Sequence, residues 1–204
     1  MDELSQRQKE ILQAIIEDYI SNMENKAADI KEKHKAVFFD RDGTLNEEVD
    51  YLYRIEDFRW LPEAVEAIQY CHAQGYLVIV VTNQSGVARG YYQEEDIWKL
   101  HEWMQQDLQS KGTYIDKFYY CPHHPEAKVA KYRQICDCRK PKSGMVLAGC
   151  RDFNVDISRS FIVGDKKRDI DSGENAGVRG FYYHGGSLLE TVKQAIAAME
   201  HQDK

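Results

Sequence analysis

The sequence lacks several features that would place it outside the ordinary globular class. No apolar run approaches the roughly 20 residues that a membrane-spanning helix needs, so we expect no membrane partner. The opening segment, MDELSQRQKE, is acidic and polar, whereas a secretory signal is basic and then apolar. The chain also has no internal repeat and no low-complexity tract. These absences lead us to expect a folded cytoplasmic protein.

A surplus of positive charge is absent as well. Lys and Arg number 27 against 34 Asp and Glu, which gives a formal net charge of −7. Proteins that neutralise the phosphates of nucleic acids carry a basic footprint, so we expect no nucleic-acid partner. Hydrophobic residues make up 43% and charged residues 30% of the 204 residues. This composition indicates one substantial domain with an appendage.

Residues 1–34 differ from the rest of the chain, and we expect them to form a helical extension and linker. They contain no Gly or Pro, and Ser5 with Gln8 has the form of a helix-capping box. Apolar residues recur every three to four positions, as in an amphipathic helix: Ile11, Leu12, Ile15, Ile16, Tyr19, Ile20 and Met23. We expect a monomer, with pairing of two such helices left open as the alternative.

From residue 35 onward, short apolar runs alternate with helical patterns. This alternation predicts an α/β domain over residues 35–204, with a mostly parallel sheet covered by helices on both faces. Ligands of such sheets bind at the carboxyl ends of the strands. The predicted strands are 36–39, 76–82, 115–121, 160–164 and 178–183, and the predicted helices are 62–74, a segment around 97–108, 143–153 and a final one after Ser187.

Two carboxylates follow the first predicted strand, in the segment Asp40-Arg41-Asp42-Gly43-Thr44. Carboxylates two residues apart at a strand end can act as a nucleophile and as a proton donor and acceptor. Gly43 allows the chain to turn sharply away from the sheet. Taken alone, the segment also fits an ordinary Asx turn.

Polar residues follow other predicted strands too. The strand YLVIVVT ends at Thr82 and Asn83, a hydroxyl and an amide that suit a phosphoryl oxygen. The strand at 160–164 runs into Asp165, with Asp169 four residues later. Carboxylate oxygens are ligands of Mg²⁺, which keeps water and substrate phosphate in its shell. We expect Asp40, Asp42 and Asp165 to bind Mg²⁺, supported by Asp169.

The cysteines suggest a second metal. Cys121-Pro122-His123 is followed, after twelve residues, by Cys136-Asp137-Cys138. One imidazole and three thiols form a set that tetrahedral structural Zn²⁺ takes, and no position remains for a reacting water. His124 is an alternative to His123 that spacing does not decide. The other two cysteines, Cys71 and Cys150, lie in predicted helices, and we expect them to be buried.

The motifs at 40–44, Thr82, Lys140 and Asp165 with Asp169, in that order, resemble those of the haloacid dehalogenase (HAD) superfamily over residues 36–185. The resemblance implies a Rossmann-like HAD fold with a minimal cap and a zinc-clamped loop. It also implies a Mg²⁺-dependent phosphoric monoester hydrolase. Asp40 would attack phosphorus to form an aspartyl-phosphate, and Asp42 would protonate the leaving oxygen and then activate water. Asp42 would bind Mg²⁺ through its backbone carbonyl, and Lys140 would offset charge repulsion.

Four segments resemble the heptose bisphosphate phosphatase family within that superfamily: FFDRDGTLN, VTNQSGVARGYY, YYCPHHPEA and CDCRKPKSGM. This resemblance implies hydrolysis of the C7 phosphate of a phosphorylated sugar, in nucleotide-heptose synthesis for lipopolysaccharide or surface glycans. Histidinol-phosphate phosphatases are the alternative family, and the preferred anomer stays open. The implied substrate contacts, of which Arg139 is the expected discriminator, are Glu48, Val49, Asp50, Tyr51, Thr82, Asn83, Gln84, Ser85, Arg139, Lys140 and Lys166.

Overall fold

The computed structural model describes residues 7, 12–13, 15–16 and 32–201. Contacts group the chain into two units, 1–33 and 34–204, and each is described by itself. In the first unit Leu12, Ile15 and Ile16 are helical, and their side chains are exposed. The predicted capping box at Ser5 and Gln8 lies outside the described residues. Among the described residues, no helix has the length and apolar character needed to span a membrane.

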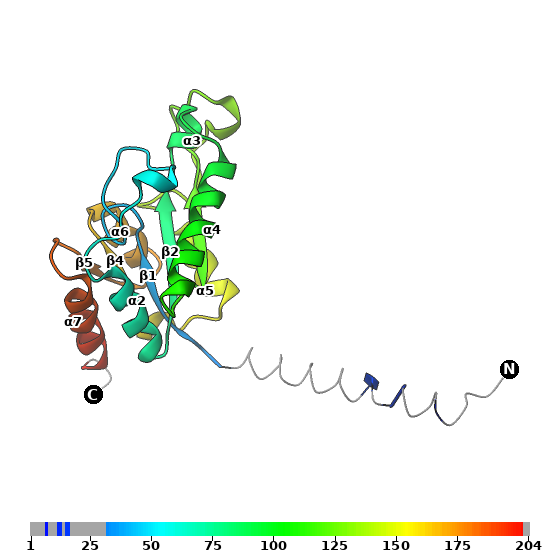
Figure 1. The fold of residues 1–204 in the computed structure, drawn as a ribbon, viewed down its shortest axis with the longest axis vertical. Helices are drawn as coiled ribbons and strands as arrows, with labels where there is room; N and C mark the ends of the chain where they lie inside the picture. The colour runs from blue at the N-terminus through cyan, green and yellow to red at the C-terminus, as the bar shows by residue number, and fades with distance from the viewer. Residues whose placement is uncertain (1–6, 8–11, 14, 17–31, 202–204) are drawn as a thin grey trace. The chain divides into compact units, whose positions relative to one another are not determined.

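The second unit is built on a five-stranded parallel sheet (Figure 1). The strand order β3-β2-β1-β4-β5 places the first strand at the centre. Alternate residues of that strand enter two different hydrophobic clusters, Val37 and Phe39 on one face and Ala36 and Phe38 on the other. The strands are β1 (Lys35–Phe39), β2 (Tyr76–Asn83), β3 (Lys117–Cys121), β4 (Phe161–Gly164) and β5 (Arg179–Tyr182).

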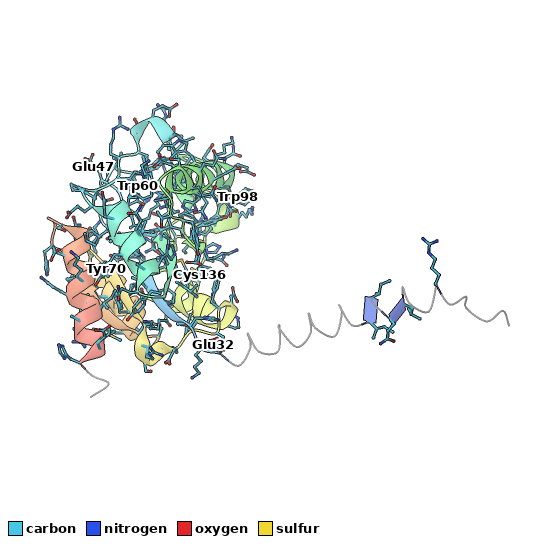
Figure 2. The ribbon with its side chains drawn as sticks, turned by 60° about the horizontal axis from the view of Figure 1, so that its bottom comes forward. Glu32, Glu47, Trp60, Tyr70, Trp98 and Cys136 are labelled. Atoms are coloured by element: carbon cyan, nitrogen blue, oxygen red, sulfur yellow. The ribbon has the colours of Figure 1, made fainter. Side chains whose placement is uncertain are left out.

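Helices cover both faces of the sheet, which confirms the predicted α/β architecture. Helices α2 (Ala64–Ala73), α4 (Glu94–Ser110) and α7 (Leu188–Glu200) contribute to the cluster of Val37 and Phe39. Helix α5 (Gly144–Asp152) contributes to the cluster of Ala36 and Phe38. The side chains of these elements fill the space between the ribbons (Figure 2). Both faces of the sheet are therefore buried, as a parallel sheet requires.

Several elements differ from the predictions. The helix predicted at 62–74 begins at Ala64, because Glu63 at its N-cap adopts a left-handed conformation with φ of 59°. The strand predicted from residue 115 begins at Lys117. Cys71 is buried as predicted, but Cys150 is only half-buried. The connections also contain the short helix α3 (Gly86–Arg89) and the 3₁₀ turns η1 (Ile55–Asp57), η2 (Ala130–Tyr132) and η3 (Ile157–Arg159).

The sequence prediction missed helix α6 (Lys167–Glu174). Its segment is short and mostly polar, with Ile170 as the one large apolar side chain, so it offers too few apolar residues to reveal a helical pattern. Small residues replace the usual apolar stripe: a Cβ on Gly173 would lie 2.3 Å from the side chain of Ile162 in β4. Because Gly173 has no side chain, the backbone of the helix can lie close to β4. The helix begins directly after Asp165 and Lys166.

Candidate active site

Lys140 is the central cation of the site at the carboxyl end of the sheet. Its Nζ donates to Asp40 Oδ1 at 2.6 Å and to the Val81 carbonyl oxygen at 2.8 Å. It also pairs with Asp169 Oδ1 at 2.7 Å. The side chains of Lys140 and Asp40 are 1% and 4% exposed. Burial raises the pKa of Asp40 to about 7, although the charge of Lys140 opposes the rise. One ammonium group thus joins segments that follow β1 and β4 to the end of β2.

Three carboxylates gather beside Lys140. Oxygens of Asp40, Asp165 and Asp169 all lie within 4.8 Å of one another. Asp165 Oδ1 is buried and has no hydrogen-bond partner. Gly43 is required here, because a Cβ on it would lie 2.5 Å from Asp165 Oδ2. A buried oxygen without a partner among carboxylates fits a hard divalent cation such as Mg²⁺.

The carboxylate of Asp42 lies outside that three-residue cluster and has its own hydrogen-bond donors. Arg41 donates from Nε at 3.1 Å and from Nη2 at 2.9 Å. Asn46 Nδ2 and Gln84 Nε2 donate at 3.0 and 2.9 Å. Arg41 is fully buried, and its Nη1 lies 3.2 Å from His101 Nε2. These contacts fix the orientation of the Asp42 carboxylate. We did not predict roles for Arg41 and Asn46, and the only sequence signal was the position of Arg41 between two aspartates.

The end of β2 supports the site in two ways. Thr82 Oγ1 accepts from Gln84 Nε2 at 2.8 Å, and the Tyr92 hydroxyl donates to Gln84 Oε1 at 2.7 Å. Asn83 Nδ2 donates to the Lys140 carbonyl at 3.1 Å, and its Oδ1 accepts from the Lys140 backbone N–H at 3.0 Å. The Asn83 side chain therefore braces the loop that carries Lys140.

A cavity of about 580 Å³ opens above these groups. Asp40, Asp42 and Asp165 lie in its wall. Every predicted substrate contact except Lys140 also lines it: Glu48, Val49, Asp50, Tyr51, Thr82, Asn83, Gln84, Ser85, Arg139 and Lys166. The wall further contains residues that the sequence prediction missed, namely Leu52, Arg89, Tyr92 and Arg168. Its size falls within the range of about 300–1,000 Å³ common to small-molecule sites.

The cations of the cavity differ in how they are paired. Lys166 is hydrogen-bonded to Glu48 and lies 3.5 Å from Asp165 Oδ2. Arg139 Nη1 donates to the carbonyl oxygen of His123 at 3.2 Å. Burial lowers the pKa of Arg139, and the positive charges of Arg168 and Arg89 lower it further.

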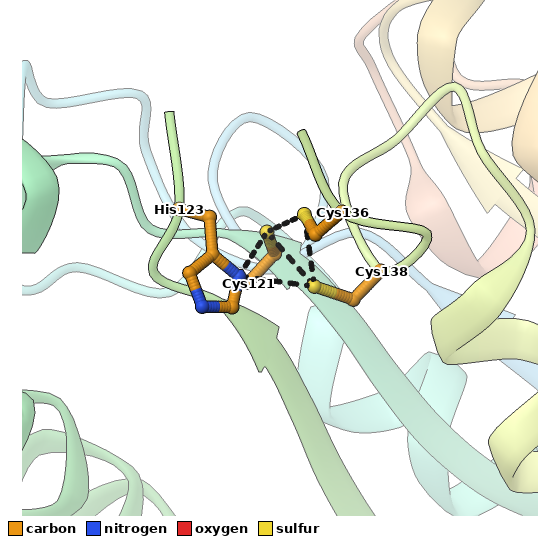
Figure 3. Close-up of side chains that lie close together, drawn as sticks. All are labelled: Cys121, His123, Cys136 and Cys138. Atoms are coloured by element: carbon orange, nitrogen blue, oxygen red, sulfur yellow. Dashed lines mark hydrogen bonds between the residues drawn. The ribbon is translucent and has the colours of Figure 1, made fainter. Parts of the chain in front are cut away.

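The four donors of the candidate zinc centre converge, as Figure 3 shows. The sulfurs of Cys121, Cys136 and Cys138 lie 3.2, 3.2 and 3.5 Å apart. His123 Nδ1 lies 3.4 Å from the Cys138 sulfur and 3.7 Å from that of Cys121. A tetrahedral Zn²⁺ with bonds of about 2.3 Å to sulfur has edges of about 3.8 Å. The donor set therefore fits Zn²⁺ after a slight expansion.

His124 does not join the cluster. Its Nδ1 accepts the backbone N–H of Glu126 at 3.1 Å. The geometry thus favours His123 over His124 as the candidate zinc ligand. Within the cluster, the hydrogen bond between Cys138 and Cys121 lowers the pKa of Cys138 to about 5, which favours the thiolate form that binds a cation.

Glu94, at the start of α4, provides a second attachment for the zinc-ligand loop, residues 121–138. The hydroxyls of Tyr120 and Tyr132 donate to its two carboxylate oxygens at 2.7 and 2.6 Å. Trp98 Nε1 in turn donates to the Tyr120 hydroxyl at 2.6 Å. The two tyrosines lie on either side of the first zinc-ligand pair, so α4 attaches to the loop at points other than the candidate zinc ligands.

Comparison with known proteins agrees with this geometry. A family profile described as polynucleotide kinase 3 phosphatase matches residues 35–182. The chain is 48% identical over 145 residues to the D-glycero-beta-D-manno-heptose-1,7-bisphosphate 7-phosphatase of Pasteurella multocida, a match covering 71% of this chain and 78% of that relative. The chain belongs to the heptose-1,7-bisphosphate 7-phosphatase family.

Two further relatives bear on the anomer of the substrate and on magnesium binding. A D-glycero-alpha-D-manno-heptose-1,7-bisphosphate 7-phosphatase of Photorhabdus laumondii is 42% identical, over 72% of this chain and 80% of its own. The crystal structure of the D,D-heptose 1,7-bisphosphate phosphatase of B. bronchiseptica, complexed with magnesium and phosphate, superimposes with a TM-score of 0.66. It is 28% identical and covers 83% of this chain and 99% of that one. The predicted family and HAD fold are confirmed.

Proposed function

We propose that the protein hydrolyses the C7 phosphate of a D-glycero-D-manno-heptose 1,7-bisphosphate, as a step in the synthesis of nucleotide-linked heptose for lipopolysaccharide or other surface glycans. The observation that carries the proposal is the Lys140 ammonium, which bridges Asp40 and Asp169 at the base of the cavity in a chain of this family. The relatives named above act on the same type of sugar. The second candidate, histidinol phosphate, has no comparable support among them.

Asp40 is the proposed nucleophile. Within the described part of the chain, its hydrogen bonds from Lys140 and from the Arg41 backbone N–H both end on Oδ1. The lone pairs of Oδ2 are therefore available to attack phosphorus, which gives an aspartyl-phosphate and expels the sugar oxygen. The fixed charge of Lys140 reduces the repulsion between this carboxylate and an anionic phosphate.

Asp42 is the proposed proton donor and acceptor. Its hydrogen bonds from Arg41, Asn46 and Gln84 hold the carboxyl group in one orientation at the cavity wall. From there it would protonate the departing sugar oxygen and later remove a proton from the water that cleaves the aspartyl-phosphate. Thr82 and Ser85 line the same cavity and would donate to phosphoryl oxygens.

Metal binding completes the proposal. Asp40, Asp165 and the backbone carbonyl of Asp42 would hold Mg²⁺, with Asp169 behind them, and the cation would neutralise phosphate charge during transfer. Cys121, His123, Cys136 and Cys138 would hold a structural Zn²⁺, whose role is to fix the loop that leads into Arg139 and Lys140.

A phosphate-release assay tests the proposal. Heptose 1,7-bisphosphate and histidinol phosphate are compared, each with and without Mg²⁺, for the native chain and for Asp40→Asn. We expect Mg²⁺-dependent release with preference for the heptose, and a loss of at least about a thousandfold in Asp40→Asn, because the nucleophile is removed. Preference for histidinol phosphate would overturn the substrate assignment. Substantial activity in Asp40→Asn would overturn the mechanism.

A further inference from the structure

A buried side-chain amide connects a tyrosine to two of the groups proposed to act on phosphate. Gln84 Nε2 donates to Asp42 Oδ2 at 2.9 Å and to Thr82 Oγ1 at 2.8 Å. Gln84 Oε1 accepts from the Tyr92 hydroxyl at 2.7 Å. Gln84 is 3% exposed and Tyr92 is 6% exposed, so water has little access to these bonds. Both ends of the amide are therefore committed to protein partners.

The direction of each hydrogen bond follows from the carboxylate of Asp42. An ionised carboxylate only accepts, so the amide atom that faces it must be the nitrogen. An amide nitrogen only donates, so Thr82 Oγ1 must accept the second bond. The amide oxygen then faces Tyr92, whose hydroxyl has to donate. Burial raises the pKa of Tyr92 to about 12, so this hydroxyl keeps its proton at neutral pH.

This arrangement leaves the hydroxyl hydrogen of Thr82 available. Among the described residues, the bond from Gln84 is the one hydrogen bond of the Thr82 side chain, and Thr82 accepts it. Thr82 is 1% exposed and lines the cavity, where a phosphoryl oxygen would be an acceptor. If the amide were reversed, its oxygen would take the Thr82 hydrogen and would also lie against the Asp42 carboxylate, which repels it.

We propose that Tyr92 is a positioning residue for phosphoryl transfer, because its hydroxyl fixes the orientation of the Gln84 amide. The oriented amide leaves the Thr82 hydrogen to a phosphoryl oxygen and provides a donor to Asp42. Tyr92 acts through Gln84 and does not need to contact the reacting phosphate. This inference rests on the proposed function, in which Thr82 binds phosphoryl oxygen and Asp42 transfers protons.

The ring of Tyr92 is packed so that its hydroxyl keeps this place. It stacks on the ring of Tyr53, with centres 5.1 Å apart and planes at 22°. It also packs in a cluster with Val87 and Ile97. A Cβ on Gly86 would lie 2.1 Å from Tyr92 Cε1, so the ring lies directly against that backbone. Loss of the hydroxyl alone should therefore change the hydrogen bonds and leave the ring in place.

The test removes that hydroxyl with Tyr92→Phe in the full chain, assayed with Mg²⁺ present. We expect kcat/KM for phosphate release from heptose 1,7-bisphosphate and from p-nitrophenyl phosphate to fall about tenfold, as for loss of a hydrogen bond to a charged group. Binding of inorganic phosphate, measured by calorimetry, should weaken as well. Tyr91→Phe, at the neighbouring tyrosine that is 50% exposed, is the matched control and should leave all three values unchanged.

A double-variant cycle separates positioning from general destabilisation. Gln84→Met removes the amide, so Tyr92 has nothing left to orient. In that background, Tyr92→Phe should change kcat/KM and phosphate binding less than about twofold, whereas independent effects would add. Urea unfolding identifies conditions under which every variant is folded.

Each result decides a different question. Equal losses from Tyr92→Phe with and without Gln84→Met, or a single variant with unchanged kcat/KM and phosphate binding, would overturn the positioning role and leave the proposed function intact. A native chain that releases phosphate from neither substrate would overturn the proposed function, and the positioning role with it.

Discussion

At the scale of single residues, the least expected feature is the fully buried guanidinium of Arg41. It donates to both carboxylate oxygens of Asp42, and it also donates to the Leu52 carbonyl oxygen at 3.1 Å. His101 lies 3.2 Å away on its other side and stacks on Phe118, with ring centres 4.3 Å apart. A buried charge of this kind is tolerated only when nearly all its donors have acceptors. His101 must therefore stay neutral to accept from Arg41.

This requirement predicts a pH dependence of stability. Burial, followed by the charge of Arg41, lowers the pKa of His101 well below its usual value near 6.5. Below about pH 6.5 the unfolded chain binds a proton at this residue and the folded chain does not, so the free energy of unfolding falls with decreasing pH. We expect a loss of up to about 1.4 kcal/mol per pH unit from this one group.

Urea unfolding of the native chain and of His101→Gln at pH 7.5, 6.5 and 5.5 checks this prediction. Glutamine can still accept from Arg41 but does not titrate, so the variant should lose less stability than the native chain over this range. Exposed His201→Gln serves as the control and should follow the native slope. Parallel slopes for the native chain and His101→Gln would contradict the assignment.

At the scale of elements, the zinc-ligand loop links the candidate zinc centre to the active-site residues Arg139 and Lys140. Residues 121–138 contain few buried apolar side chains, and Ala127 is one of them. The loop is held by the four candidate zinc ligands and by the tyrosine contacts to Glu94. It ends at Arg139 and Lys140, which carry the cations of the site. We therefore expect a metal bound by these ligands to affect catalysis by positioning Arg139 and Lys140.

Disrupting the candidate zinc centre should reduce activity, although this centre does not contact the substrate directly. For a Cys136→Ser, Cys138→Ser double variant we expect kcat/KM for phosphate release to fall at least about tenfold, since misplacing charged contacts to substrate costs about 1.5–3 kcal/mol each. Bound zinc, measured by metal analysis, should be lost in parallel. Cys150→Ser, half-buried in α5, is the control. A folded double variant with unchanged turnover and substrate affinity would show that zinc does not position the loop.

The elements also show what a sequence can predict here. The run YLVIVVT identifies β2 because a strand buried on both faces is apolar throughout. The reactive residues then follow from their positions at strand ends. The positions of Arg89 and Arg168 could not be predicted in this way, because they lie on α3 and α6, two short helices with few large apolar residues. Their proximity to Arg139 depends on tertiary packing, which spacing along the chain does not encode.

At the scale of the whole molecule, the acidic total coexists with a cavity that holds both carboxylates and cations. The formal net charge is −7, yet Arg89, Arg139 and Arg168 line the site beside its carboxylates. Overall charge therefore bears on nucleic-acid binding and not on small phosphorylated sugars. Residues 1–33 form a separate unit. In that unit, the side chains of Leu12, Ile15 and Ile16 are 48%, 59% and 43% exposed.

Removing residues 1–33 should leave catalysis nearly unchanged. The proposed catalytic, metal and substrate residues all lie between Asp40 and Asp169, within the second unit. We expect kcat/KM of the shortened chain to stay within about twofold of the full chain, because no group that stabilises the transition state is removed. Light scattering of the full chain should give one 23.7-kDa subunit. A mass twice as large that disappears on truncation would contradict a monomer and indicate pairing through the extension.

The parallel direction of the strands has a practical consequence. The chain enters β2, β3 and β5 after turns at Gly75, Gly112 and Gly177, at the end of the sheet opposite the cavity. The residues that line the cavity all follow strand ends or loops on the other side. At Gly112, an added Cβ would meet no atom within 4 Å. A peptide tag or surface tether inserted there would leave the cavity facing the solution, so the enzyme can be immobilised in one orientation with its substrate entrance open.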